Sequence, residues 1–141
     1  MGRNYEDPRG AAGVNKDKRI EWVWELIEAL KKEPDALILV EGQHDMETLQ
    51  YLGITHEIMT VGGKRMFDDL SPFEGKNVII LTDFDLAGQV LFKRLRMELE
   101  IMGYHPNSYY WNQLKKSTKG FIKAIEELDT YLHSMKGDNI T

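Results

Sequence analysis

The sequence predicts an α/β fold in which about four parallel strands form one sheet, with helices on both faces. Two apolar runs, within 36–40 and 77–82, have the length of strands and no polar alternation, which is typical of strands buried on both faces. Amphipathic helical patterns alternate with these runs along the chain. Because strands that alternate with helices imply right-handed crossovers, we expect a parallel sheet that helices cover on both sides.

The first half of the chain contains two of the expected strands. Residues 1–15 include Pro8 and three glycines without a hydrophobic period, so they are predicted to form a flexible N-terminal arm. A helix is expected to follow Asp17 and to end before Pro34, because its apolar residues recur at helical spacing. The strand 36–40 comes next, followed by a helix over about 44–52 and a second strand over 57–61.

The second half contains the other two expected strands. A short helix over 64–70 precedes the third strand, 77–82, and the next helix is expected to end near Met102 with a core stripe of Leu91, Leu95, Leu99 and Met102. Residues 107–111 are predicted to form the fourth strand, and a C-terminal helix is expected over about 117–135. Since neither an internal repeat nor a long linker divides the chain, residues 16–141 are predicted to form a single domain.

The composition excludes several classes of site. The 141 residues contain no cysteine, which excludes disulfides, thiolate metal sites and a cysteine nucleophile, and no apolar run is long enough to span a membrane. We therefore expect a cytoplasmic protein without a membrane partner. The net charge of −5 argues against nucleic-acid binding by bulk charge alone, but residues 86–125 contain seven basic residues against two acidic ones. A polyanion is expected to prefer that stretch.

Carboxylates follow both strongly apolar strands. Glu41 comes directly after the first, and Asp83 and Asp85 come directly after the third. Residues i and i+2 of an extended segment point the same way, so Asp83 and Asp85 can face one spot at the sheet edge where ligands bind in α/β proteins. Oxygen ligands of this kind suit Mg²⁺ or Mn²⁺. The alternative, which the pattern leaves open, is that Asp85 only caps the helix that follows it.

Three ordered motifs resemble the Toprim domain of topoisomerases, bacterial-type primases, OLD-family nucleases, RecR proteins and the 5S ribosomal RNA maturase, and above all the small stand-alone Toprim proteins of archaea. They are Leu39-Val40-Glu41-Gly42-x-x-Asp45, Thr60-Val61-Gly62-Gly63 and Val78-Ile79-Ile80-Leu81-Thr82-Asp83-Phe84-Asp85-x-x-Gly88, within residues 34–111. The resemblance implies a Rossmann-like Toprim fold. It also implies that Glu41 is an acid/base group and metal ligand, that Asp83 and Asp85 are Mg²⁺ ligands, and that Gly42, Asp45 and Gly88 support them.

The sequence leads to the hypothesis of a Mg²⁺-dependent protein, with one or two ions and Mn²⁺ as a possible substitute, that hydrolyses phosphodiesters of RNA or DNA. The alternative is a non-catalytic module that uses its metal only to help bind nucleic acid or protein in an RNA or DNA processing complex. Lys64, after the glycine pair, and Arg94, on the flank of the helix after Asp85, are expected to contact the substrate backbone. The next candidates for that contact are Lys115, Lys116 and Lys119. His44 is either a proton-transfer group or an ordinary surface residue.

Overall fold

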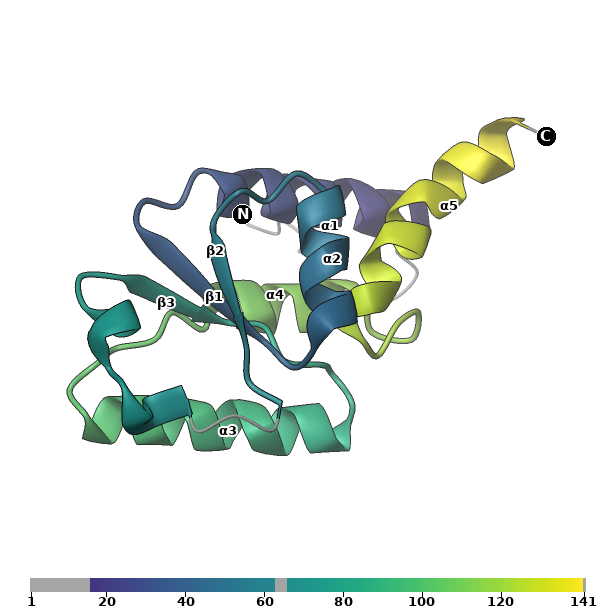
Figure 1. The fold of residues 1–141 in the computed structure, drawn as a ribbon. Helices are drawn as coiled ribbons and strands as arrows, with labels where there is room; N and C mark the ends of the chain where they lie inside the picture. Colours follow the sequence, from purple (N-terminus) through teal and green to yellow (C-terminus); the bar gives the residue numbers. More distant parts are fainter. Residues whose placement is uncertain (1–15, 63–65, 141) are drawn as a thin grey trace, which may run out of the picture.

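The protein is an α/β domain built on a parallel sheet. The computed structural model describes residues 16–62 and 66–140, so the predicted arm 1–15 and the candidate Lys64 lie outside the described residues. Within them, the sheet has three strands in the order β2-β1-β3, namely β1 Ala36–Val40, β2 Glu57–Thr60 and β3 Asn77–Ile80 (Figure 1). The predicted fold class is therefore confirmed at this level, with a smaller sheet than expected.

Helices surround this sheet. The α-helices are α1 Lys16–Lys31, α2 Gln43–Tyr51, α3 Leu86–Ile101, α4 Tyr109–Ser117 and α5 Leu128–Ile140. Three 3₁₀ turns, η1 Met66–Asp68, η2 Ser71–Phe73 and η3 Ile125–Glu127, lie between them. No helix among the described residues is long and apolar enough to cross a membrane.

The two layers of helices follow from the strand order. The chain leaves the central strand β1 toward one side to form β2 and then crosses back to the other side to form β3. Right-handed crossovers in opposite directions run over opposite faces of a parallel sheet. Figure 1 shows the result, with α3 and the turns η1 and η2 below the sheet and α1, α2 and α5 above it. All five residues of β1 are buried, as expected of a strand covered on both faces.

The predicted fourth strand over 107–111 is wrong. Only an isolated parallel bridge joins Asn107 to Ile79, and the chain then enters α4. The side-chain oxygen Oδ1 of Asn107 accepts a hydrogen bond from the N–H of Tyr109 at 2.9 Å, a local turn that starts the helix. The buried residues of α4 are Tyr110, Trp111, Leu114 and Ser117, whose spacing is helical. The aromatic run therefore fills the core as one face of a helix.

The C-terminal helix also begins later than the predicted residue 117. Ser117 ends α4, and the chain then turns through Gly120, whose φ of +88° favours glycine, before α5 begins at Leu128. Glu127 closes this connection, because its Oε1 accepts hydrogen bonds from the N–H groups of Lys123 at 2.8 Å and Ala124 at 2.9 Å. The connection brings the start of η3 to the carboxyl end of the sheet, where the candidate site lies.

Candidate functional site

Glu41 links the carboxyl ends of β1 and β3. The register pairs Leu39 with Ile80, so Glu41 and Asp83 follow their strands at neighbouring positions of the same edge. The half-buried carboxylate of Glu41 accepts, through Oε2, a hydrogen bond of 2.9 Å from the backbone N–H of Asp83. The segments that follow β1 and β3, 42 residues apart in sequence, are thereby connected by the side chain expected to act in acid/base chemistry.

Asp83 is held from the other side by the C-terminal part of the chain. Its Oδ1 accepts a hydrogen bond of 2.9 Å from the N–H of Ile125, the first residue of η3. The pKa of Asp83 is raised to about 6, chiefly by burial and also by the nearby carboxylates of Asp45, Glu41 and Asp85, while the Ile125 hydrogen bond opposes the shift. Asp83 thus lies where like charges gather, which is typical of functional sites.

Asp85 is the N-cap of α3. Its Oδ1 accepts a hydrogen bond of 2.8 Å from the N–H of Gly88, and its side chain is exposed. The capping role that the sequence left open is therefore confirmed. It engages only one carboxylate oxygen, and the other oxygen accepts no hydrogen bond from the described residues.

Gly88 is required by a close approach of two backbone segments. A Cβ atom at this position would lie 2.1 Å from the carbonyl oxygen of Asp83 and 2.5 Å from its carbon. The hydroxyl of the buried Thr82 donates to the carbonyl of Gly88 at 2.8 Å, which fastens the first turn of α3 to the strand end. The glycine thus lets the helix begin directly beside Asp83.

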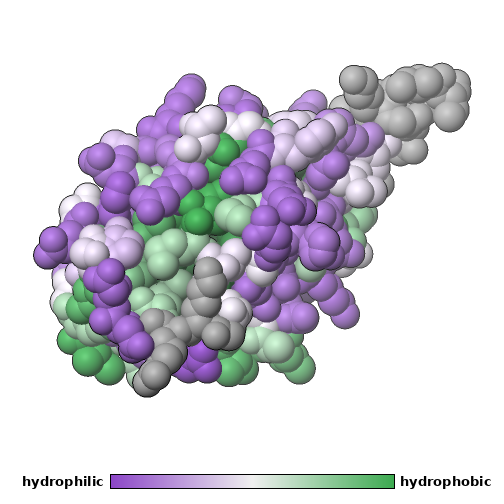
Figure 2. Space-filling model, viewed as in Figure 1, coloured by the Kyte–Doolittle hydropathy of each residue, from purple (hydrophilic) through white to green (hydrophobic). Residues whose placement is uncertain are grey.

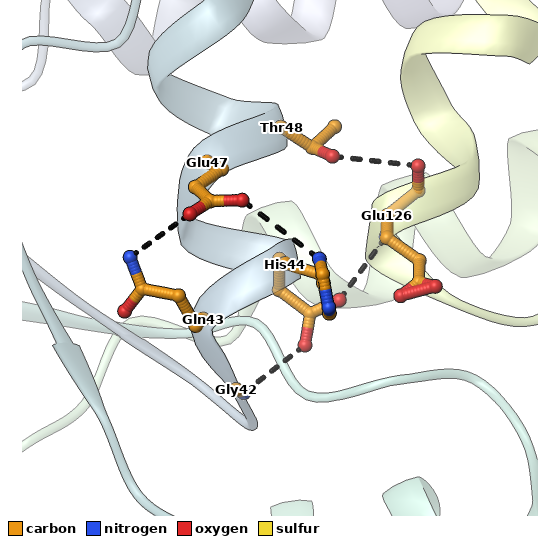
Figure 3. Close-up of polar contacts among 7 residues, drawn as sticks. Gly42, Gln43, His44, Glu47, Thr48 and Glu126 are labelled. Atoms are coloured by element: carbon orange, nitrogen blue, oxygen red, sulfur yellow. Dashed lines mark hydrogen bonds and ion pairs between the residues drawn. The ribbon is translucent and has the colours of Figure 1, made fainter.

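Asp45 is buried and accepts two backbone hydrogen bonds. One comes from Gly42 at 3.2 Å, within the turn after Glu41, and the other from Glu126 at 3.1 Å, in η3. Burial raises the pKa of Asp45, and the two hydrogen bonds oppose that shift. The hydroxyl of Thr48 also reaches the carbonyl of Glu126 at 3.4 Å (Figure 3). Asp45 is therefore placed to fix the turn after Glu41, as the resemblance implied, and it also ties α2 to η3.

The carboxylates of Glu41, Asp83 and Asp85 lie in one another's field but face different donors. Each has one oxygen bonded to a backbone N–H, of Asp83, Ile125 and Gly88 respectively. Within 16–62 and 66–140, no three His, Asp or Glu side chains are gathered so as to hold a metal ion. Convergence of the three carboxylates on one cation stays a prediction. The donor chemistry fits Mg²⁺, which keeps several waters and binds through one or two carboxylates together with substrate phosphates.

Of the two candidates for substrate contact, only Arg94 is described. It is exposed on α3, about 12 Å along the helix from Leu86 at 1.5 Å per residue. Arg94 lines a pocket of about 270 Å³ together with Val61, Met66, Phe67, Asp68, Leu95 and Glu98. None of the three candidate carboxylates lines that pocket. A contact between Arg94 and a phosphate at the carboxylates therefore stays a prediction.

His44 and Gln43 belong to the exposed surface of α2. The Nδ1 atom of His44 lies 3.8 Å from Oε1 of Glu47, and Nε2 of Gln43 donates to Oε2 of the same residue at 3.2 Å (Figure 3). The side chain of His44 is 83% exposed. Its contacts are those of the ordinary surface residue that the sequence analysis gave as one alternative.

The sequence did not identify two parts of the site. The backbone N–H groups of Ile125 and Glu126, which fix Asp83 and Asp45, have no side-chain signature that a sequence could reveal. The second part is the contribution of Phe84 and Lys123 to a pocket whose other lysines, Lys115, Lys116 and Lys119, the sequence analysis did name as later candidates. The excess of basic residues over 86–125 was the signal for this second part.

The chain is similar to proteins of archaea and of one further organism. It is 32% identical over 124 residues to a UPF0292 protein of Methanocaldococcus jannaschii, over 85% of this chain and 97% of that protein. It is 36% identical over 107 residues to a UPF0292 protein of Pyrococcus abyssi, over 75% of this chain and 81% of that one. A solved structure of a protein from Aquifex aeolicus matches with a TM-score of 0.65 and 34% identity, over 73% of this chain and 94% of that chain. No family model matches the chain.

Proposed function

The chain belongs to the UPF0292 family, and we propose that it is a Toprim-type protein that hydrolyses phosphodiester bonds of RNA or DNA with Mg²⁺ or Mn²⁺. We also propose that the fold is a Toprim fold. A parallel sheet of order β2-β1-β3 with acidic residues after β1 and β3 is compatible with it. Nucleic acid is the proposed partner.

The observation that supports this proposal most is the arrangement around Asp83. A carboxylate whose pKa is raised to about 6 follows the outer strand β3, and the carboxylate of Glu41, which follows the central strand β1, accepts a hydrogen bond of 2.9 Å from the backbone N–H of that same residue. Like charges that are kept together at a cost in stability are common where a protein binds a cation or transfers a proton.

The proposed roles follow from the position of each side chain. Asp83 and Asp85 would hold the divalent ion, which would supply positive charge against the scissile phosphate. Glu41 would position the Asp83 loop and move a proton to or from the attacking water. Asp45, Gly42 and Gly88 would fix the two turns on which these carboxylates lie, through the contacts described above.

The test is metal-dependent cleavage by the purified protein. Labelled structured RNA and single- and double-stranded DNA are incubated with Mg²⁺, with Mn²⁺ or with EDTA, and the products are separated by size. We expect cleavage with either metal, none with EDTA and none with Asp83→Asn. Glu33→Gln is the matched control. Glu33 is also a carboxylate that accepts hydrogen bonds from residues distant in sequence, Asn77 and Tyr110, but it lies at the opposite edge of the sheet. Cleavage that survives Asp83→Asn would contradict the proposal.

One observation favours the second candidate, a module that binds nucleic acid or protein without cleaving it. One oxygen of each of Glu41, Asp83 and Asp85 already accepts a backbone hydrogen bond that holds the fold, which suits a binding role as well as a catalytic one. A module of this kind would use the metal only to dock phosphates, so it would bind nucleic acid more tightly with Mg²⁺ than with EDTA and would release no product over long incubation. The same experiment therefore separates the two functions.

A further inference from the structure

A strongly basic pocket lies beside the carboxylates. It has a volume of about 430 Å³, and four of its eight lining residues are lysines, Lys115, Lys116, Lys119 and Lys123. None of the lining residues is acidic. In a chain with a net charge of −5, four cations around one concave surface are a marked local excess.

These four lysines are not neutralised by acidic side chains. Among the described residues, none of them forms an ion pair, although ion pairs join Lys31 to Glu28 and Lys76 to Glu57 elsewhere. Lys115 lies over the ring of Trp111, with Nζ 5.3 Å from the ring centroid, a cation–π contact that leaves its charge uncompensated by any carboxylate of the described residues. The other three side chains are exposed. Their charge is therefore available to a ligand.

The pocket and the carboxylates share one backbone segment. Phe84, which lies between Asp83 and Asp85, lines the pocket, and its N–H donates to the carbonyl of Lys123 at 2.7 Å. Two residues after Lys123, the N–H of Ile125 donates to Asp83. A ligand bound along the lysines therefore lies next to the loop that holds the candidate metal ligands.

We propose that this lysine pocket binds the phosphodiester backbone of a single nucleic-acid strand and leads it to Glu41, Asp83 and Asp85. This inference rests on the proposed function and assigns its substrate surface to the pocket rather than to Lys64 and Arg94. A single strand fits better than a duplex, because the volume lies in the range of small-ligand pockets. Basic grooves that contain aromatic side chains are typical of single-strand binding, and Phe84 is the aromatic residue among those that line this pocket.

The first experiment measures binding without cleavage. A fluorescein-labelled single strand of twelve nucleotides, as RNA and as DNA of the same sequence, is titrated in EDTA and followed by anisotropy. The variant Lys119→Gln/Lys123→Gln is compared with the matched control Lys32→Gln/Lys76→Gln, which removes the same charge at the opposite edge of the sheet. Both variants are first checked by thermal melting, and Lys116→Gln/Lys119→Gln replaces the first if its melting temperature falls.

We expect the pocket variant to bind about tenfold more weakly than wild type at 0.1 M salt, because each lysine–phosphate contact releases counterions. Its plot of log affinity against log salt should be shallower by about 1.4, at about 0.7 for each of two contacts on a single strand. The control should match wild type within twofold. This result with RNA, with DNA or with both supports the proposal, because the phosphodiester backbone is common to them.

Two outcomes would overturn the inference. One is equal affinity and an unchanged salt slope in the pocket variant and the control. The other is full displacement of the strand by poly-glutamate at an equal concentration of charge, which would assign the pocket to acidic peptides. The experiments distinguish failure of this inference from failure of the proposed function. If binding depends on the lysines but no metal-dependent cleavage occurs, only the proposed nuclease activity is overturned. Conversely, cleavage unaffected by Lys119→Gln/Lys123→Gln overturns only the lysine pocket.

Discussion

The two edges of the sheet use carboxylates in opposite ways. At the amino edge, Glu33 follows α1 and receives neutral donors on both oxygens, the hydroxyl of Tyr110 and the side-chain amide of Asn77, the latter at 2.9 Å. At the carboxyl edge, where Glu41, Asp45, Asp83 and Asp85 lie, burial raises the pKa of Asp83, and the charges of the other three carboxylates raise it as well. In this second group, backbone N–H groups are the donors, one for each of Glu41, Asp83 and Asp85 and two for Asp45.

The difference distinguishes a structural carboxylate from a candidate functional one. Glu33 joins α1 to α4 and β3 through fully paired oxygens, and burial together with the Glu33 hydrogen bond raises the pKa of Tyr110, which keeps the phenol protonated as a donor. Pairing of this kind stabilises a fold. At the carboxyl edge, the like charges cost stability, so that their proximity indicates selection for something other than folding.

The comparison predicts its largest effect for Glu41→Gln. Removal of a group that transfers a proton lowers a rate by roughly 10²- to 10⁴-fold. We expect a loss of this size in metal-dependent cleavage, measured as the initial rate on a labelled strand, with Glu33→Gln unchanged per folded molecule. If Glu33→Gln lowered the rate as much as Glu41→Gln, the distinction between the two edges would be wrong.

The next effect concerns the close approach at Gly88. A Cβ atom 2.1 Å from the carbonyl oxygen of Asp83 forces the first turn of α3 away from the strand end. We expect Gly88→Ala to lower the free energy of unfolding by about 3 kcal/mol, the upper part of the range for overpacking. Urea unfolding measures this loss. Gly42→Ala is the matched control, because a Cβ atom there meets nothing within 4 Å, and an equal loss in both variants would contradict the steric explanation.

Much of the fold could be predicted because the strongest signals were also the most local. The apolar runs of β1 and β3 and the acidic residues directly after them required no knowledge of the rest of the chain. The expected fourth strand failed for a physical reason. Tyr109-Tyr110-Trp111 has the composition of a strand, but Tyr110, Trp111 and Leu114 reach the core together only as one face of a helix.

The sequence predicted the carboxylates of the candidate site but not the backbone groups that hold them in place. Two strands that end at the same edge of a parallel sheet bring Glu41 and Asp83 together, so their position followed from the fold class. The supports of Asp83 and Asp45 are backbone N–H groups 42 and 81 residues away. Any residue except proline offers such a donor, so that no residue type marks Ile125 or Glu126 as part of the site.

The third prediction concerns pH. The pKa of Asp83 is raised from 3.8 to about 6 in the folded protein, so the folded state binds a proton more tightly than the unfolded state does. The resulting stabilisation is complete below about pH 4 and is lost as the pH rises through 6. For this partly exposed group, we expect the free energy of unfolding to fall by about 1 to 2 kcal/mol between pH 4 and pH 7.

Urea unfolding without divalent cations measures this pH dependence. Asp83→Asn keeps an oxygen for the N–H of Ile125 but cannot ionise, so it should flatten the profile and raise the stability at pH 7. Asp45, whose pKa is also raised, leaves a smaller slope in that variant. An unchanged profile in Asp83→Asn would show that neither burial nor the neighbouring carboxylates raise the pKa of Asp83 in the folded protein.

The smallest expected effect on stability separates the two roles of Asp85. As the N-cap of α3, its carboxylate accepts the N–H of Gly88 at 2.8 Å, a contact that asparagine can replace and alanine cannot. We expect Asp85→Ala to lower the free energy of unfolding by about 1 kcal/mol and Asp85→Asn to change it by a few tenths at most. Cleavage should be lost equally in both variants, because neither keeps the negative charge proposed to hold the metal ion. If Asp85→Asn retained cleavage while Asp85→Ala lost stability, Asp85 would be a helix cap alone and would resemble Glu33 rather than Asp83.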